Sequence, residues 1–206
     1  MPNGVTVSLS SLCRDVLLLA AAIALPAAAQ PSPPAPPDAE TLKLVQTCGA
    51  CHGVDGNSTQ PIYPVLAGQS WRYIFNELRD FKEGRRSNPV MSPVAANLTR
   101  DQMVALGNYF AAQKPRAVKF EADAARVEAG KKISDAALCP MCHLGGFVGQ
   151  NEIPRVAGQW PQYVKQQLVD FRAKKRTNDA GNMTSVTRNL SDDDIENLAQ
   201  YIANLS

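Results

Sequence analysis

The 206-residue sequence has few aromatic side chains, little net charge and only two histidines. Phe, Trp and Tyr make up 6% of it, so side chains alone would give thin cores if the chain divided into two domains. Its net charge of +2 argues against a nucleic-acid partner, because phosphate binding requires a clustered basic surface. Beyond residue 29 no apolar run approaches the ~20 residues that span a bilayer, and we expect no transmembrane segment in the mature chain.

The first 29 residues have the features of an export signal. Arg14 precedes an unbroken apolar run from Val16 to Leu25, and the small residues Ala27 to Ala29 offer a cleavage site. The alternative is an uncleaved membrane anchor, but the run is about half the length that spans a bilayer. We predict a signal peptide at residues 1–29, an extended proline-rich spacer at residues 30–37 and, in a bacterial cell, localisation in the periplasm.

The remainder of the chain is an internal repeat. Cys48-Gly-Ala-Cys51-His52 recurs as Cys139-Pro-Met-Cys142-His143. The matching continues along each half, pairing Pro64 to Gln69 with Pro154 to Gln159, Tyr73 with Tyr163, Leu78 with Leu168, Phe81 with Phe171, Arg86 with Arg176 and Met91 with Met183. We therefore predict two duplicated domains, at residues 38–115 and 116–206, each smaller than a usual domain.

Helical periodicity dominates both halves, and neither contains a convincing strand. Thr99 followed by Gln102 predicts the capped start of a last helix in the first half, and Ser191 followed by Asp194 does the same in the second. The other expected helices cover residues 39–47, 69–82, 122–134 and 159–174. The predicted fold class is all-α, with two tandem helical domains.

The repeated motif, Cys-x-x-Cys-His, is the attachment signature of c-type haem. Two thiols on one helical turn can form thioethers with one porphyrin, and the adjacent histidine can ligate its iron. We predict two covalently bound haem c groups, one on Cys48, Cys51 and His52 and one on Cys139, Cys142 and His143. The alternatives are a zinc site, although a zinc ribbon spaces its cysteine pairs only about 15–20 residues apart, and a disulfide-exchange motif, which favours a βαβ context.

Both histidines belong to the motifs, so methionine is the candidate for the sixth iron ligand. Met1 leaves with the signal peptide, Met141 lies between two haem cysteines, and Met103 has the position of a helix core residue. Met91 and Met183 match each other, in segments expected to be loops before the last helix. We predict them as axial ligands, because His/Met ligation closes the iron and gives the fairly high potential of an electron relay.

Two further groups of residues could support the haems. The backbone carbonyls of Pro64 and Pro154 could accept the second ring N–H of each histidine, unless these prolines only shape turns. The basic residues after the amphipathic helices could neutralise haem propionates, meet a partner or form solvated helix ends: Arg85, Arg86, Lys174, Lys175 and Arg176.

With these residues the sequence resembles the di-haem cytochromes c4, from Cys48 to Ser206. The resemblance rests on the two haem motifs, the Pro-x-Leu/Val-Ala-Gly-Gln stretches, the Tyr-x4-Leu-x2-Phe helices, and Arg176 to Asp179 before Met183. It implies two class I cytochrome c domains, each wrapped around a covalent haem, packed face to face with their propionates close together. One departure is the segment Leu144 to Phe147, which lacks the polar pattern of Gly53 to Asn57 and predicts different surroundings for the second haem.

These features predict a periplasmic di-haem c-type cytochrome of a respiratory chain that carries electrons and is not an enzyme. The resemblance implies a terminal oxidase, cytochrome bc1 or a periplasmic dehydrogenase as its redox partners. The alternative is the di-haem electron-transfer subunit of a periplasmic dehydrogenase complex, which has the same chemistry but a permanent partner. A di-haem peroxidase would need an open iron site with acid–base groups, and the lack of a spare histidine argues against it.

Overall fold

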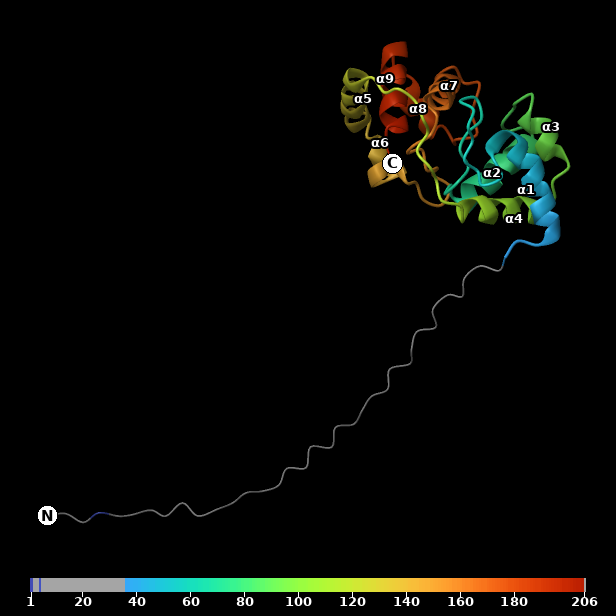
Figure 1. Cartoon of the computed structure of the whole chain (residues 1–206). Coiled ribbons are helices and arrows are strands. Elements are labelled where there is room, and N and C mark those ends of the chain that lie inside the picture. The colour runs from blue at the N-terminus through green and yellow to red at the C-terminus, as the bar shows by residue number, and fades with distance from the viewer. Residues whose placement is uncertain (2–3, 5–35, 206) are drawn as a thin grey trace. The chain divides into compact units, whose positions relative to one another are not determined.

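Two similar sets of helices occupy the part of the chain that the computed structural model describes, residues 36–205 together with Met1 and Gly4 (Figure 1). The first set is α1 (Ala39–His52), α2 (Trp71–Lys82), α3 (Met91–Ala96) and α4 (Arg100–Ala111). The second set is α5 (Ala124–Ala136), α6 (Cys139–His143), the 3-10 helix η1 (Gly145–Phe147), α7 (Pro161–Arg172), α8 (Asn182–Thr187) and α9 (Asp192–Ala203). The predicted signal peptide, apart from Met1 and Gly4, and most of the predicted spacer lie outside the described residues.

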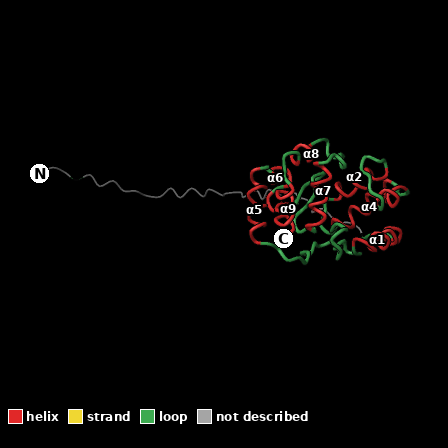
Figure 2. Tube along the Cα trace, turned by 90° about the horizontal axis from the view of Figure 1, so that it is seen from above, coloured by secondary structure: helices red, strands yellow, loops and turns green. Residues whose placement is uncertain are grey.

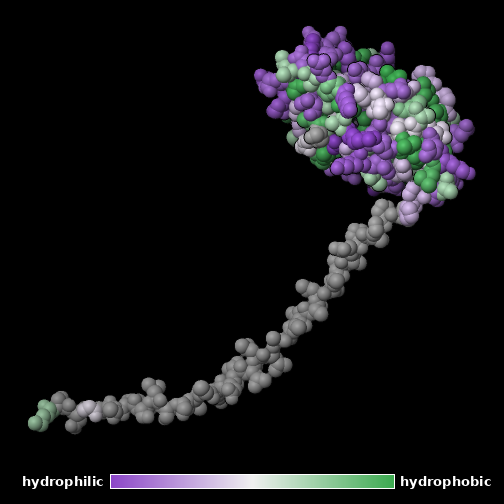
Figure 3. Space-filling model, in the orientation of Figure 1, coloured by the Kyte–Doolittle hydropathy of each residue, from purple (hydrophilic) through white to green (hydrophobic). Residues whose placement is uncertain are grey.

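Loops join the helices, and within residues 36–205 the one β feature is an isolated bridge between Gln150 and Ile153 (Figure 2). The predicted all-α fold class is therefore confirmed. None of the helices in this range is long and apolar enough to cross a membrane. The face of the folded region seen in Figure 3 is largely hydrophilic, with apolar patches between the polar side chains.

Local capping fixes where the last helix of each half begins. The Thr99 hydroxyl accepts from the Gln102 N–H at 3.2 Å, and the Gln102 side chain accepts from the Thr99 N–H at 2.9 Å. Ser191 and Asp194 form the same reciprocal pair at the start of α9. Both predicted capping arrangements are confirmed, and each satisfies backbone donors that a helix start would otherwise leave unpaired.

Each half has its own apolar core, formed where its last helix crosses its neighbours. In the first half α4 packs on α1 and α2 around Val45 and Phe110, and in the second α9 packs on α5 and α7 around Ile195. The crossing of α5 and α9 is close enough to require glycine, because a Cβ at Gly130 would lie 2.1 Å from the carbonyl oxygen of Asn197. The two cores hold the haem motifs at their edges.

The segments that contain Met91 and Met183 are helical, so the expectation that they are loops was wrong. Asn88 accepts from the N–H of Met91 at 2.9 Å and caps α3. Asp179 accepts from the N–H of Thr184 at 2.7 Å and does the same for α8. These side-chain acceptors stabilise helices of 6 residues each, which are too short to show a helical period in the sequence.

Other helix boundaries also differ from the sequence expectation. α1 runs on through the first haem motif to His52, whereas Leu138 is left-handed (φ 57°) and separates α6 from α5. Pro140 lies in the first turn of α6, where its missing N–H leaves no intrahelical bond unmade. Pro161 has the same role in α7, which begins there and not at residue 159.

Candidate functional site

The first haem motif lies at the C-terminal end of α1. Cys48 and Cys51 are half-buried free thiols, and His52 is buried, with 7% of its surface exposed. The Nδ1 atom of His52 lies 2.9 Å from the carbonyl oxygen of Pro64. A carbonyl can only accept, so Nδ1 carries the proton and Nε2 keeps a lone pair that can bind a metal.

The second haem motif forms α6 and has the same arrangement. Cys139 is a half-buried free thiol and Cys142 an exposed one. The Nδ1 atom of His143 lies 3.0 Å from the carbonyl oxygen of Pro154. The predicted use of a proline carbonyl as the acceptor for each histidine is thus confirmed in both halves, and both imidazoles present Nε2.

Burial sets the protonation state of these groups. It lowers the pKa of both His52 and His143 below the ordinary value, against the opposing effect of their hydrogen bonds to the proline carbonyls. Burial also raises the pKa of the Cys48 and Cys139 thiols. Both imidazoles are therefore neutral at neutral pH, which is the form in which histidine binds iron.

The structure brings each predicted methionine against the same core as the cysteines of its own half. Met91 and Cys48 pack on the first core, and Met183 and Cys139 pack on the second. Met103 is 2% exposed within α4, as expected for a packing residue. Each half offers two thiols for the thioether bonds of a c-type haem, and an imidazole of fixed tautomer and a methionine thioether as donors to its iron, so the residues present fit that group.

The two histidines have different neighbours. The Phe147 ring stacks on His143 with centroids 6.2 Å apart and an angle of 15° between planes, whereas Tyr63 lies tilted beside His52. The carbonyls of Phe147 and Gly56 have equivalent roles. The carbonyl of Gly56 accepts from the N–H groups of residues 66 and 67, and that of Phe147 from the N–H groups of residues 156 and 157. The departure noted in the sequence thus replaces a glycine by a buried aromatic ring next to the second histidine.

The basic residues after α2 and α7 divide into two groups. Arg176 is buried and Arg86 half-buried between the halves, where both guanidinium groups bond to Glu77 and to Gln167. The expectation that they could be solvated helix ends was wrong for these two, because charged partners compensate their burial. The remaining three are exposed at the ends of α2 and α7: Arg85, Lys174 and Lys175.

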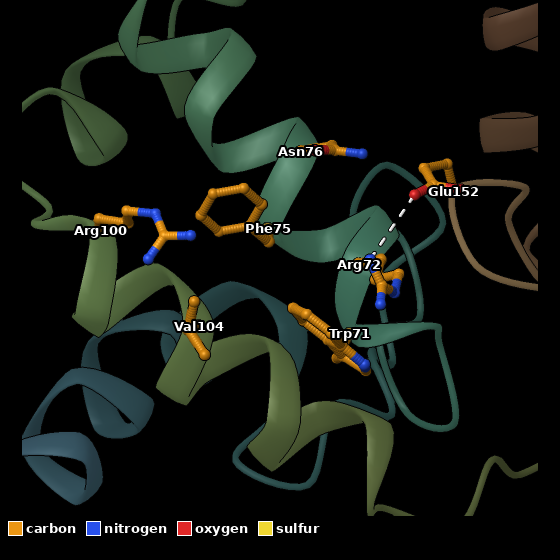
Figure 4. Close-up of a pocket in the computed structure, with 7 residues that line it drawn as sticks. All are labelled: Trp71, Arg72, Phe75, Asn76, Arg100, Val104 and Glu152. Carbon is orange, nitrogen blue, oxygen red and sulfur yellow. Dashed lines mark ion pairs between the residues drawn. The ribbon is translucent and has the colours of Figure 1, made fainter.

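A shallow pocket lies apart from both haem motifs, between α2, α4 and the loop that carries Glu152 (Figure 4). Arg72 stacks over the Trp71 ring at 4.8 Å and pairs with Glu152 at 4.0 Å. Arg100 stacks over the Phe75 ring at 5.7 Å. The lining residues are Trp71, Arg72, Phe75, Asn76, Arg100, Val104 and Glu152. It contains no residue of the predicted haem centres.

Sequence reasoning missed three features of these centres. It assigned no role to Phe147, to the glutamines that end the Pro-x-Leu/Val-Ala-Gly-Gln stretches, or to the pair Glu77 and Gln167. For the two glutamines, Gln69 and Gln159, the signal was present as an exact match between the halves. What the match does not reveal is that their partners lie in the opposite half.

Two all-α halves, each with an attachment motif and an oriented histidine, define a c-type cytochrome with two domains. The family model for cytochrome c matches residues 39–114 and 127–206. Cytochrome c4 of Pseudomonas aeruginosa is 38% identical over 167 residues, covering 77% of this chain and 83% of that protein. The thiosulfate dehydrogenase electron acceptor of Stutzerimonas stutzeri is 34% identical over 170 residues, covering 77% and 78%.

Solved structures agree with these relatives. The reduced recombinant cytochrome c4 from Pseudomonas stutzeri superposes with a TM-score of 0.76 at 36% identity, covering 83% of this chain and all of that one. The chain belongs to the di-haem cytochrome c4 family. It is accordingly a two-domain electron-transfer cytochrome with two covalently bound haem c groups.

Proposed function

We propose that each half binds one haem through the four residues that the repeat pairs. In this assignment two cysteines form the thioethers, and a histidine and a methionine are the axial ligands of the iron. The set for the first haem is Cys48, Cys51, His52 and Met91. The set for the second haem is Cys139, Cys142, His143 and Met183.

One observation carries this assignment. In each half the histidine donates Nδ1–H to a proline carbonyl, at 2.9 Å for His52 and 3.0 Å for His143, which leaves Nε2 as the metal-binding atom. Such a partner fixes the tautomer and the ring orientation of a metal ligand and raises its basicity. Met91 and Met183 support the assignment because each packs on the same core as a cysteine of its own motif.

Bound haem supplies an iron that gains and loses one electron. The chain's own residues would keep both axial positions filled and surround the ligands with apolar side chains, so little rearranges when the charge changes. This favours a carrier over an enzyme. We infer a free periplasmic carrier, exported by residues 1–29, whose domains 38–115 and 116–206 pass electrons between a respiratory donor and a terminal oxidase or other acceptor.

The test is the optical spectrum of the purified holoprotein, oxidised and reduced, with and without carbon monoxide. Two low-spin c-type haems that do not react with carbon monoxide are expected if both irons have methionine as the sixth ligand. Carbon monoxide binding by either haem in the native protein would mean an open or labile site and would overturn the ligand assignment for that half.

A second function is favoured by one comparison. The similarity to a thiosulfate dehydrogenase electron acceptor supports a role as the electron-accepting partner of a periplasmic dehydrogenase. Gel filtration of the protein from its own cells at native expression level separates the two. Elution at the size of the chain alone supports the free carrier, whereas co-elution with a larger redox subunit supports the dehydrogenase complex.

A further inference from the structure

Two buried glutamines, Gln69 and Gln159, each reach across the boundary between the halves. Gln159 accepts from the N–H of Val65 at 2.8 Å and donates to its carbonyl oxygen at 3.0 Å. Gln69 accepts from the N–H of Arg155 and donates to its carbonyl oxygen, both at 2.8 Å. Each glutamine thus pairs with both polar groups of one backbone residue in the opposite half.

In each glutamine a second backbone N–H donates to the side-chain oxygen and fixes the orientation of the side-chain amide. The side-chain oxygen of Gln159 also accepts from the N–H of Trp160 at 3.1 Å, and that of Gln69 from the N–H of Ser70 at 2.9 Å. Two N–H groups converge on each oxygen, so a flipped amide would lose both bonds. Both residues are at most 7% exposed, and water cannot easily replace these contacts.

The backbone residue that each glutamine holds directly follows a haem-supporting proline. The carbonyl of Pro64 and the N–H of Val65 belong to one planar peptide group. His52 donates to that carbonyl, and Gln159 accepts from that N–H. In the other half the carbonyl of Pro154 accepts from His143, and Gln69 accepts from the N–H of the same peptide group.

We propose that Gln69 and Gln159 are positioning residues, each of which controls the proximal histidine of the haem in the opposite half. The inference rests on the proposed function, in which these histidines ligate iron. Hydrogen bonds in a chain polarise one another. A glutamine that accepts from the peptide N–H therefore makes the peptide carbonyl a stronger acceptor for the histidine.

The direction of the effect follows from the charge of the iron. A histidine that donates to a stronger acceptor is a more basic ligand, and a more basic ligand stabilises ferric over ferrous iron. Gln159 therefore lowers the reduction potential of the haem in the first half, and Gln69 lowers that of the haem in the second. Separation or reorientation of the halves would raise both potentials.

The experiment uses the full-length holoprotein with the variants Gln159→Leu and Gln69→Leu. Labelling with 15N-histidine gives signals from two residues only, because the chain has two histidines. Contacts with the Phe147 ring identify those of His143. The readouts are the paramagnetic shifts of each imidazole and the midpoint potential of each haem. The control is Gln166→Leu, because Gln166 bonds to Asp170 within its own helix.

The expected pattern is crossed. Gln159→Leu should move the His52 signals and raise the potential of the first haem, Gln69→Leu should do the same for His143 and the second haem, and the control should move neither. A shift confined to the substituted half, equal shifts at both haems, or no shift in a folded variant would overturn the proposal.

Gln159→Glu keeps the test decisive if the leucine variants do not fold. A carboxylate retains one oxygen for the Val65 N–H, where it accepts more strongly, while its other oxygen no longer donates to the Val65 carbonyl. The potential of the first haem should therefore fall further than that of the second, and the His52 signals should move. Equal changes at both haems, or unmoved His52 signals, would contradict the proposal. If the histidines did not ligate iron at all, the result would differ from a failure of the glutamine proposal, because the imidazole signals of the wild-type protein would then lack paramagnetic shifts.

Discussion

Glu77 and Gln167 occupy equivalent positions in the two repeats, and they accept hydrogen bonds from the same two guanidinium groups. Glu77 accepts from Arg86 at 2.5 Å and from Arg176 at 2.7 Å. Gln167 accepts from the same two arginines at 2.7 and 2.8 Å. One carboxylate therefore faces two guanidinium groups whose side chains are 12% and 9% exposed, and the duplicated interface differs between the halves by one charge.

Replacement of Glu77 by glutamine should destabilise the protein strongly. The variant would leave two guanidinium groups without their shared carboxylate, and the loss of one partner from a buried ionic group costs about 3 kcal/mol or more. Unfolding of the holoprotein in guanidinium chloride measures the change in the free energy of unfolding. Glu83→Gln is the control, because Glu83 pairs with Arg85 on the surface, where such a pair contributes roughly 0–1 kcal/mol. Equal losses in the two variants would contradict a special role for Glu77.

Stability should fall at alkaline pH through Tyr73, whose hydroxyl accepts from Arg176 at 3.0 Å. Burial raises the pKa of Tyr73 to about 12, while tyrosine in an unfolded chain titrates near its ordinary value of about 10. The folded state holds the proton more tightly, so this contribution is complete below about pH 10 and is lost as the pH rises toward 12.

The loss through Tyr73 should be about 2–3 kcal/mol, at ~1.4 kcal/mol per pKa unit. Denaturation curves between pH 8 and about 12 should show this additional decline in the wild type and not in Tyr73→Phe. The phenylalanine variant should be less stable at pH 8, because it loses the bond to Arg176. Its free energy of unfolding should, however, change less as the pH rises. Parallel pH profiles for the two proteins would rule out Tyr73 as the source.

The features that the sequence predicted correctly depend on short-range contacts or on a known covalent motif. The capping pair Thr99 and Gln102 and the carbonyl of Pro64 near His52 fall in this group, because their partners lie within about a dozen positions along the chain. Periodicity located the long helices but gave no signal for α3 or α8, where the side chain of Asn88 or Asp179 stabilises a short helix.

The features that the sequence did not predict are contacts between the halves. Gln159 bonds to Val65, and Arg176 to Glu77, over separations of 94 and 99 residues. The repeat showed that these positions match across the halves, but a match between copies does not reveal which copy supplies the partner. The position of Phe147 was equally hidden, because a buried aromatic residue with φ of +57° occupies the place of Gly56, and such a residue is uncommon in that conformation.

Substitution of one methionine ligand should open one haem. Met91→Ala should bind carbon monoxide at one of the two haems, because the sixth position of that iron loses its thioether, and Met183→Ala should do so at the other. Titration of the reduced holoprotein, followed by its absorbance spectrum, gives the stoichiometry. Met103→Leu should not react, since Met103 is a packing residue in the first core. Retention of two unreactive haems in Met91→Ala would show that another group ligates the first iron.

Folding should depend on haem attachment. Each half is small, and its apolar core borders Cys48 or Cys139 directly. Small domains that depend on a metal are commonly unfolded without it. A variant with alanine at all four motif cysteines should therefore lose most of its helical circular dichroism and its cooperative thermal transition. Cys48→Ala with Cys51→Ala alone should destabilise the second half as well, because Val65 and Glu77 of the first half are bonded to Gln159 and Arg176. A native-like melt of the four-alanine variant would show that the helical cores are sufficient without haem.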